Sequence, residues 1–240
     1  MGLTRTSTPL LSIVTVVRNG ERDIEATLAS ICRFQGPEVE VVVVDGASTD
    51  GTLAIARRFA ERIDILVSEP DSGIYDAMNK GIALAHGRFV VHINVGDRLL
   101  RVPLAELRGA ADTVAALSFP VDFAEGGRHV PFFDWRRKTY NGLHHQGTFY
   151  RRVPALRYDT AFRTFADYDL NLRLLRPRDV ACLPESVACH AADGVSHERS
   201  RFGEFYTVVA RNCGRAWVAV AWFLFKLRGL QWRLKTLSRS

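Results

Sequence analysis

Three aspartates stand at positions where side chains could bind a ligand. Asp45 follows the valine-rich run 39–44, Asp97 follows the apolar run 89–94 and a glycine, and Asp71 lies in the loop before the helix between them. In an open parallel α/β sheet, ligands bind outside the carboxyl ends of the strands. Carboxylates at that edge can contact a nucleotide, and one on a glycine turn can hold a metal ion against a phosphate. This spacing therefore points to an activated phosphate ester as the substrate.

Alternating strands and helices must position these aspartates. Continuous β-branched runs are typical of buried parallel strands, and apolar residues at helical spacing are typical of the helices that cover them. We predict strands over 11–17, 39–45, 65–67 and 89–94, and helices over about 23–34, 53–63 and 75–85. This alternation predicts a doubly wound α/β layer with right-handed connections.

The pattern changes after Asp97. Residues 101–160 mix short apolar pieces with Gly, Pro and Arg, which favours antiparallel strands and a surface that faces an acceptor. Helical spacing returns over 165–175, and from Arg199 a long helical pattern carries the chain to its end. We predict a domain over 1–200, with a donor-nucleotide half (10–100) and an acceptor half (101–200), and then an amphipathic helical extension over 201–240.

Bulk composition narrows the class of protein. With 240 residues, of which 47% are hydrophobic and 24% charged, the chain can bury a sizeable core. The net charge of +6 is compatible with several anionic partners and does not choose among them; our interpretation includes no nucleic-acid partner. Four scattered cysteines and a strand-like N-terminal run favour a reduced, cytoplasmic protein without a signal peptide.

Other nucleotide signatures are absent from the sequence. The glycines at the ends of 46–51 are spaced as in a phosphate-binding loop, but Thr52 follows where that loop needs its lysine. No G-x-G-x-x-G opens the first predicted helix, so kinases, ATPases and dinucleotide-dependent dehydrogenases are disfavoured. Ser48 and Asp50 suit turns and helix capping. Asp45 suits hydrogen bonding to a base or ribose, with capping as the alternative.

Seven segments, in a characteristic order, carry a resemblance to a known family. They are SIVTVVRNG, VVVDGASTDGT, SEPDSGIYDAMNKGIALAHG, HINVGD, HHQGTFYRR, FADYDLNLRL and DGVS, and they span about residues 10–200. The chain resembles the family 2 inverting glycosyltransferases of the GT-A fold, and among them the small bacterial members of the polysaccharide or colanic-acid-biosynthesis type. The resemblance implies a Rossmann-like α/β fold of the nucleotide-diphospho-sugar transferases, with a mixed sheet flanked by helices and a C-terminal helical extension.

The resemblance implies roles for residues of the first half. Thr15, Asp45, Asp71 and Asn79 match positions that contact the nucleotide, and Asp97 matches the second carboxylate of the family's metal motif. Asp97 would hold Mg²⁺ or Mn²⁺ against the diphosphate, which offsets the negative charge that grows as the nucleoside diphosphate leaves. HINVGD departs from the family because it has one acid where many members have two or three. Diphosphate oxygens and water would complete the metal's octahedron.

The resemblance also implies a catalytic base on the acceptor side. Asp167 matches the family's acid that takes the proton of the acceptor hydroxyl as its oxygen attacks the anomeric carbon. Asp169 is the rival candidate, but positions two apart on a helix face different ways, so both cannot serve the same proton. Asp169 and Arg173, at i and i+4, suit a structural ion pair. We therefore predict Asp167 as the base.

A second set of residues could line the acceptor or the phosphate. His145 and Gln146 match an H-Q element of these enzymes, with an ordinary surface histidine as the alternative. His190 could be a further metal or phosphate ligand, and Ser196, in the tight loop 194–196, is expected at the edge of the site. A plain turn is the alternative for these last two.

The last part of the chain has a pattern of its own. Residues 216–225 (AWVAVAWFLF) are uncharged, and three tryptophans and seven basic residues lie in and around them. The run is shorter than the ~20 residues that a spanning helix needs. A cationic, tryptophan-bearing helix instead favours the membrane interface. Packing of this helix on the catalytic domain or on a second subunit, as a homodimer, is the alternative.

These observations together predict an enzyme. We expect a glycosyltransferase that moves a sugar from a nucleotide-diphosphate donor to a hydroxyl of a glycan or lipid-linked acceptor with inversion, in cell-surface polysaccharide biosynthesis. A UDP-sugar is the favoured donor, with GDP- and dTDP-sugars as alternatives, and the expected location is the cytoplasmic face of the bacterial inner membrane. The alternative functions are a non-catalytic nucleotide-sugar-binding protein and a sugar-phosphate nucleotidyltransferase. The latter needs a glycine-rich loop with Arg and Lys, of which 17–20 offers little.

Overall fold

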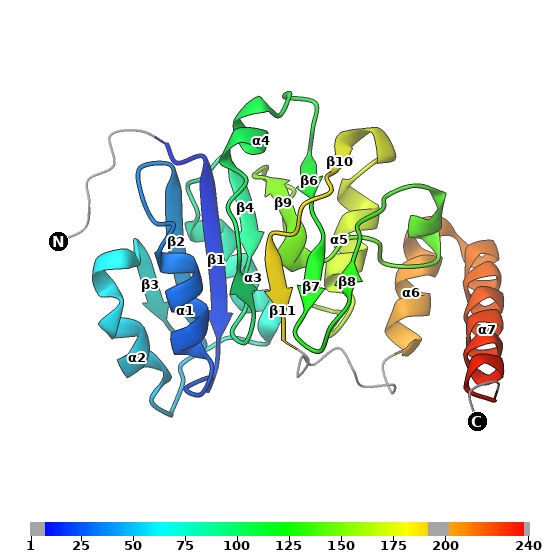
Figure 1. Ribbon diagram of the computed structural model, residues 1–240, viewed down its shortest axis with the longest axis horizontal. Coiled ribbons are helices and arrows are strands. Elements are labelled where there is room, and N and C mark those ends of the chain that lie inside the picture. Colours follow the sequence, from blue (N-terminus) through cyan, green and yellow to red (C-terminus); the bar gives the residue numbers. More distant parts are fainter. Residues whose placement is uncertain (1–7, 192–201, 238–240) are drawn as a thin grey trace.

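The computed structural model describes residues 8–191 and 202–237. At its centre is a mixed sheet of seven strands in the order β10-β6-β9-β4-β1-β2-β3 (Figure 1). The parallel strands are β1 (Leu11–Val17), β2 (Val39–Asp45), β3 (Ile65–Ser68) and β4 (Phe89–His92). Antiparallel to β4 and to β6 (Ala116–Ser118) is β9 (Thr148–Arg151), and β10 (Val180–Cys182) runs parallel to β6. The predicted α/β layer is confirmed.

Strand register aligns the ends of β1, β2 and β3. Val17 is opposite Asp45, and Asp45 is opposite Ser68. Every residue of β1 and β2 is buried, which explains why both strands are unbroken apolar runs instead of alternating ones. The carboxyl end of β2 is therefore fixed from both sides by backbone pairing.

Helices cover both faces of this sheet (Figure 1). α1 (Ile24–Cys32) and α2 (Thr52–Arg58) lie on one face, and α3 (Ile74–Leu84) lies on the other. Successive residues of β1 divide between the two cores, since Ile13 joins Leu28 of α1 and Val14 joins Met78 of α3. Gly81 lets α3 approach the sheet, because a Cβ there would lie 2.3 Å from Val14 Cγ1. The helical pattern over 53–63 becomes α2 followed by a 3-10 turn, η1 (Ala60–Arg62), instead of one helix.

A second sheet carries loops of the C-terminal half. Its strand order is β5-β11-β7-β8, and its strands are β5 (Arg98–Leu99), β11 (Ala188–His190), β7 (Val121–Phe123) and β8 (Arg128–His129). β5 begins directly after Asp97 and pairs antiparallel with β11, with Arg98 opposite Cys189. This register brings His190, the next residue of β11, to Asp97. The antiparallel strands predicted within 101–160 are therefore confirmed, and they are divided between two sheets.

Shorter helices connect these strands. They are α4 (Leu104–Gly109) and the 3-10 turns η2 (Trp135–Lys138), η3 (His145–Gly147) and η4 (Pro177–Asp179). Of these short elements in the described part of the chain, η3 contacts both Asp97 and Asp167.

Three longer helices complete the described chain. α5 (Ala166–Leu174) packs against α6 (Phe202–Cys213), and α7 (Arg215–Leu237) lies outside α6, at the end of the molecule away from β3 (Figure 1). The Phe205 ring joins all three, because its centre lies 5.4 Å from that of Tyr168 and 5.3 Å from that of Phe225. Gly214, with φ of 92°, divides the helical pattern that we predicted to run on from Arg199. None of the described helices is both long and apolar enough to cross a membrane.

Candidate active site

Asp45 ends β2 and is fully buried. Its carboxylate accepts hydrogen bonds from the Ser68 hydroxyl (2.6 Å) and from the Ser48 N–H (3.1 Å) and hydroxyl. Ser48 therefore orients Asp45 and does not cap α2, which corrects the capping role predicted for it. Asp50 does receive the Thr52 N–H at the start of α2 (3.0 Å), as predicted.

The loops that follow β1 and β2 are joined to each other. The side-chain oxygen of Asn19 accepts the Thr49 N–H (2.8 Å), and the Glu21 carboxylate accepts the Gly51 N–H (2.6 Å). Asn19 has a left-handed backbone, with φ of 52°, which asparagine adopts more readily than most residues. These contacts join the two loops beside Asp45.

Asp71 lies against the backbone of Gly46. A Cβ built on Gly46 would lie 2.0 Å from Asp71 Oδ2, so the close approach depends on glycine. The other carboxylate oxygen of Asp71 accepts the Gly73 N–H (2.9 Å). Because Gly46 directly follows Asp45, the structure brings these two predicted nucleotide contacts together in one corner, which we call the aspartate corner.

Thr15 and Asn79 have partners elsewhere in the protein. The fully buried Thr15 hydroxyl donates to the Ile93 carbonyl (2.8 Å). The Asn79 amide both donates to the Tyr158 carbonyl (2.9 Å) and accepts the Tyr158 N–H (2.8 Å), so it anchors the segment after β9 to α3. The structure does not bring these two side chains into the aspartate corner, and their contact with a nucleotide stays a prediction.

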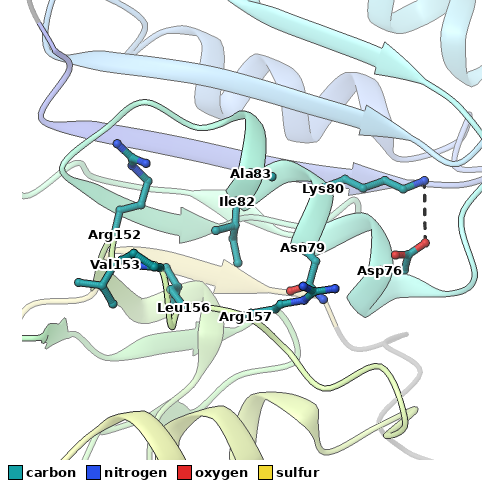
Figure 2. A pocket seen from close by; sticks show the side chains of 10 residues that line it. Asp76, Asn79, Lys80, Ile82, Ala83, Arg152, Val153, Leu156 and Arg157 are labelled. Carbon is teal, nitrogen blue, oxygen red and sulfur yellow. Dashed lines mark ion pairs between the residues drawn. The ribbon is translucent and has the colours of Figure 1, made fainter.

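Asn79 instead lines a separate pocket of about 460 Å³ between α3 and the segment 152–157 (Figure 2). Figure 2 shows the Lys80 side chain beside Asp76, with 3.8 Å between Nζ and Oδ2. Lys80 also pairs with Glu69 (2.9 Å). In the described part of the chain, the walls of this pocket include none of the predicted catalytic or metal-binding aspartates.

Asp97 lies at the end of a glycine turn after β4 and is almost fully buried. The turn is anchored to α1 because Thr27 donates to the Asp97 carbonyl (2.9 Å) and accepts the Gly96 N–H (3.1 Å). The Asp97 carboxylate accepts a hydrogen bond from Gln146 Nε2 (2.7 Å) and lies 2.7 Å from His190 Nδ1. Three residues predicted for the site from separate motifs therefore meet at one point.

The turn η3 contacts two carboxylates through adjacent residues. Gln146 donates to Asp97, while His145 Nδ1 lies 3.8 Å from Asp167 Oδ2. The other ring nitrogen of His145 lies 3.3 Å from the Asn94 amide nitrogen. His145 and Gln146 thus contact the two predicted site aspartates, and their role toward acceptor or phosphate stays a prediction.

Residues on either side hold η3 in place. The His144 ring packs against His129 and His190, with ring centres 5.6 and 5.1 Å away. Burial, together with the charge of neighbouring histidines, lowers the pKa of His144 to about 3, so its imidazole is neutral near pH 7. At the other end, a Cβ on Gly147 would lie 2.4 Å from the Phe119 carbonyl oxygen, so the turn packs directly on backbone.

Asp167 and Asp169 face different surroundings, as expected of positions two apart on a helix. Asp167 is partly exposed at the mouth of the site and accepts hydrogen bonds from the Asn141 amide (3.0 Å) and the Tyr168 N–H (2.7 Å). Asp169 is fully buried and lies 3.4 Å from Arg173 Nε, so the predicted ion pair is confirmed.

The sequence analysis missed two asparagines that contact these acids. Asn141 binds Asp167, and Asn212 of α6 donates to Asp169 (2.8 Å). Neither stands in a recognisable motif, and each partner lies 26 or more residues away along the chain. Ser196 lies outside the described residues. Within 8–191 and 202–237, no group of three or more His, Cys, Asp or Glu is placed to hold a metal ion.

Comparisons with known proteins show which family this chain belongs to. The family model described as Glycosyl transferase family 2 matches residues 12–96. A PGL/p-HBAD biosynthesis glycosyltransferase of Mycobacterium tuberculosis is 33% identical over 186 residues, which cover 69% of this chain and 69% of that protein. The chain therefore belongs to glycosyltransferase family 2, whose members are nucleotide-sugar-dependent transferases, and the resemblance inferred from its motifs is confirmed.

Solved structures confirm the GT-A fold. S. aureus TarS in complex with UDP-GlcNAc matches with a TM-score of 0.67 at 19% identity, over 84% of this chain and 66% of the TarS chain. Glucosyl-3-phosphoglycerate synthase from Mycobacterium tuberculosis, in complex with Mn²⁺, UDP and glucosyl-3-phosphoglycerate, matches with a TM-score of 0.61 at 18% identity. That match covers 86% of this chain and 80% of the synthase chain. At these identities the likeness concerns the fold alone.

Proposed function

We propose that this protein transfers a sugar from a nucleotide-diphosphate donor to a hydroxyl of a glycan or lipid-linked acceptor, with inversion, in the synthesis of a cell-surface glycan. One observation carries the proposal. Adjacent residues of η3 reach Asp97, at the end where a diphosphate is expected, and Asp167, the predicted base. Donor phosphates and a proton acceptor would therefore belong to one site, on opposite sides of the anomeric carbon, as an in-line displacement requires.

The relatives support the choice of substrates. The mycobacterial relative is named for PGL/p-HBAD biosynthesis, TarS was solved with UDP-GlcNAc, and the synthase with UDP. We accordingly favour a UDP-sugar as donor, with GDP- and dTDP-sugars as alternatives. In this proposal Asp45 and Asp71 bind the nucleoside from the aspartate corner.

Asp167 takes the proton in the proposed reaction. The acceptor hydroxyl attacks the anomeric carbon from the side opposite the leaving diphosphate, so the C–O bond to the acceptor forms as the bond to the phosphate oxygen breaks. The hydroxyl proton passes to the Asp167 carboxylate. Asp169 cannot substitute, because it is buried and paired with Arg173.

A divalent cation fits the donor end of the site. Asp97 lies directly before β5 and His190 ends the paired strand β11, so their oxygen and nitrogen atoms converge to 2.7 Å; a carboxylate is an ordinary ligand of Mn²⁺, and an imidazole binds divalent transition metals. Among the described residues, the ion-pair partner of Asp97 is His190 and not a Lys or Arg. Asp97 and His190 would hold Mg²⁺ or Mn²⁺, with diphosphate oxygens and water as further ligands. When bound, the ion would offset charge on the leaving diphosphate.

A screen of nucleotide sugars tests this proposal. UDP-, GDP- and dTDP-sugars, each with and without Mn²⁺, are added to the protein, and the melting temperature is recorded, because a ligand that binds only the folded state raises it. We expect one nucleotide class to stabilise the protein, more strongly with Mn²⁺, and its sugar to be transferred with inverted configuration at the anomeric carbon. Binding without transfer to any glycan acceptor would favour a non-catalytic binding protein. Release of pyrophosphate from a nucleoside triphosphate and a sugar phosphate would favour the nucleotidyltransferase.

We further propose that α7 rests on an anionic membrane surface on the cytoplasmic side. Its inner face packs on the protein through Trp217, Ala221 and Phe225. A second apolar face is exposed, through Val220, Phe223 and Leu227. Residues 201–240 hold eight Lys and Arg and one Glu, a net charge of +7 in a chain whose total is +6. Apolar side chains beside concentrated positive charge suit an anionic lipid surface.

Vesicle sedimentation tests the membrane contact. The full chain is mixed with phosphatidylcholine vesicles that contain or lack phosphatidylglycerol, and we expect pelleting only with the anionic lipid. Phe223→Glu should abolish pelleting, while Val130→Glu, at an exposed apolar residue outside α7, should not. A dimer by size-exclusion chromatography that Phe223→Glu converts to a monomer, without vesicle binding by either form, would assign this face to a homodimer instead.

A further inference from the structure

A one-way chain of hydrogen bonds ends on Asp167. The Tyr150 hydroxyl donates to Asn171 Oδ1 (2.7 Å), Asn171 Nδ2 donates to Asn141 Oδ1 (3.2 Å), and Asn141 Nδ2 donates to Asp167 Oδ2 (3.0 Å). Tyr150 and Asn171 are buried, and Asn141 is partly buried next to the site. These hydrogen bonds link β9, α5 and the segment after η2, so the residues that form them come from three separate parts of the acceptor side.

The direction of this series of hydrogen bonds is fixed by groups that have a single hydrogen-bonding role. The Leu143 backbone N–H, which can only donate, points at Asn141 Oδ1 (3.4 Å), so the Asn141 amide nitrogen must face Asp167. At the far end, burial raises the pKa of Tyr150, which keeps its hydroxyl protonated and able to donate. Reversing either amide would set oxygen against oxygen.

Asp167 is consequently held at both oxygens by donors that stay in place. Oδ1 accepts the Tyr168 N–H from the first turn of α5, and Oδ2 accepts Asn141. A carboxylate with one fixed donor can rotate about its bond to Cβ, whereas a second fixed donor sets the plane of the group. The lone pairs that remain then have one orientation relative to the acceptor hydroxyl.

We infer that Asn141 is a positioning residue for the base: its amide fixes the Asp167 carboxylate plane and keeps the carboxylate ready to accept the acceptor proton. This inference rests on the proposed function, in which Asp167 is the base. Asn171 and Tyr150 act one and two steps further back, by fixing the orientation of the Asn141 amide. None of the three needs to touch the substrate.

Asn141→Asp is the sharpest variant, because it keeps the size of the side chain and the oxygen that accepts from Leu143 and Asn171. It replaces the donor to Asp167 with a second carboxylate oxygen, and so it also adds a negative charge. A hydrogen bond to a charged group corresponds to roughly a ten- to hundredfold change in an equilibrium or rate. We expect kcat for transfer from the donor selected by the melting screen to fall by that factor, with the donor KM and the UDP–Mn²⁺ dissociation constant unchanged. Asn141→Ala, which adds no charge, should lower kcat in the same range.

A matched control exists two residues along α5. Asn212 donates to Asp169 in the same way (2.8 Å), but Asp169 faces away from the site. Asn212→Asp should lower the melting temperature and leave kcat of the folded enzyme unchanged. Equal losses of kcat in Asn212→Asp and Asn141→Asp would show a general structural effect and would overturn the inference.

Asp167→Asn tests the proposed base separately from the positioning role of Asn141. If transfer survives Asp167→Asn, the proposed base is wrong whatever Asn141 does. If Asp167→Asn abolishes transfer but Asn141→Asp and Asn141→Ala keep the full kcat, the inference alone fails. The expected result is loss in both, with no further loss when Asn141→Ala is combined with Asp167→Asn, since a positioning residue has no effect once its base is gone.

Discussion

The aspartate corner and the acceptor side are built in opposite ways. In the corner, loops that leave adjacent parallel strands are tied by backbone N–H groups, as between Asn19 and Thr49 or Glu21 and Gly51. On the acceptor side, side chains contact side chains across long stretches of sequence: Asn141 donates to Asp167 over 26 residues, and Asn212 donates to Asp169 over 43. The corner is a property of strand order and turn shape, whereas the acceptor side depends on individual polar side chains.

This difference has an energetic consequence. A backbone donor remains when its own side chain is replaced, so the corner should tolerate substitution at donors such as Thr49 and be sensitive only at the side chains that accept, such as Asn19 and Glu21. When one member of a buried side-chain pair is replaced, the hydrogen bond between the two is lost. The polar group of the other member then stays buried without a partner and without water. Substitutions should therefore affect chemistry most on the acceptor side and nucleotide binding most in the corner.

Asp167→Asn should have the largest effect. Replacing a general base removes about two to four orders of magnitude from the rate, and the amide keeps the size of the side chain. We expect kcat for transfer to fall by that amount while calorimetric binding of the nucleoside diphosphate is unchanged. A parallel loss of nucleotide affinity would mean that the two regions are not separable.

Asp97→Ala should come next and should act on both regions. Loss of an electrostatic partner for the leaving diphosphate corresponds to roughly a hundred- to thousandfold in rate. We expect this loss of transfer together with loss of the extra thermal stabilisation that Mn²⁺ gives to bound UDP. Asp112→Ala, at an exposed aspartate paired with Arg88, is the control for removal of one negative charge and should change neither measurement.

Gly46→Ala should affect the corner alone. The new Cβ would lie 2.0 Å from Asp71 Oδ2 and must displace that carboxylate. We expect UDP to bind about tenfold more weakly, the equivalent of one hydrogen bond to a charged group, with kcat at saturating donor little changed. Gly109→Ala introduces the same methyl where no atom lies within 4 Å and should bind UDP normally. Normal binding by Gly46→Ala would remove Asp71 from the donor site.

The smallest effect concerns stability against acid, and it involves one buried histidine from each half of the chain. Burial lowers the pKa of His92 and of His144 to about 3, below that of an unfolded histidine. The unfolded state therefore binds more protons between about pH 6.5 and pH 3, so stability falls as pH falls through that window. From pH 7.5 to pH 5.5 we expect about 1 kcal/mol of unfolding free energy to be lost per histidine.

Urea denaturation at the two pH values measures this loss. His144→Gln cannot take up a proton, so its stability should depend less on pH than that of the natural protein, whatever its stability at pH 7.5. An unchanged pH dependence in His144→Gln would mean that His144 is not held neutral in the folded state.

The same difference explains how far the sequence could predict the structure. The parallel strands, the helices between them and the glycine turn before Asp97 follow from periodicity and turn chemistry, because local pattern decides them. The separation of Asp167 from Asp169 also followed, since helix geometry is local. The Asn141 and Asn212 contacts did not follow, because a lone asparagine has no periodic or motif signal and its partner is set by tertiary packing. The capping of α2 predicted for Ser48 was wrong for a similar reason, because the role of Ser48 depends on the direction of the Asp45 side chain.

Gly147 limits how the site can change over time. η3 packs on the Phe119 carbonyl without room for a side chain at Gly147. The turn therefore cannot shift by one residue or accept an insertion without losing this contact. His145 and Gln146 are neighbours in the chain, so one peptide bond sets the spacing between the proposed base and the proposed metal ligand. Proteins descended from this one would therefore inherit that spacing unchanged. A descendant enzyme with a new acceptor would have to arise through substitutions in the surrounding segments, such as 130–140, while the reaction itself stayed the same.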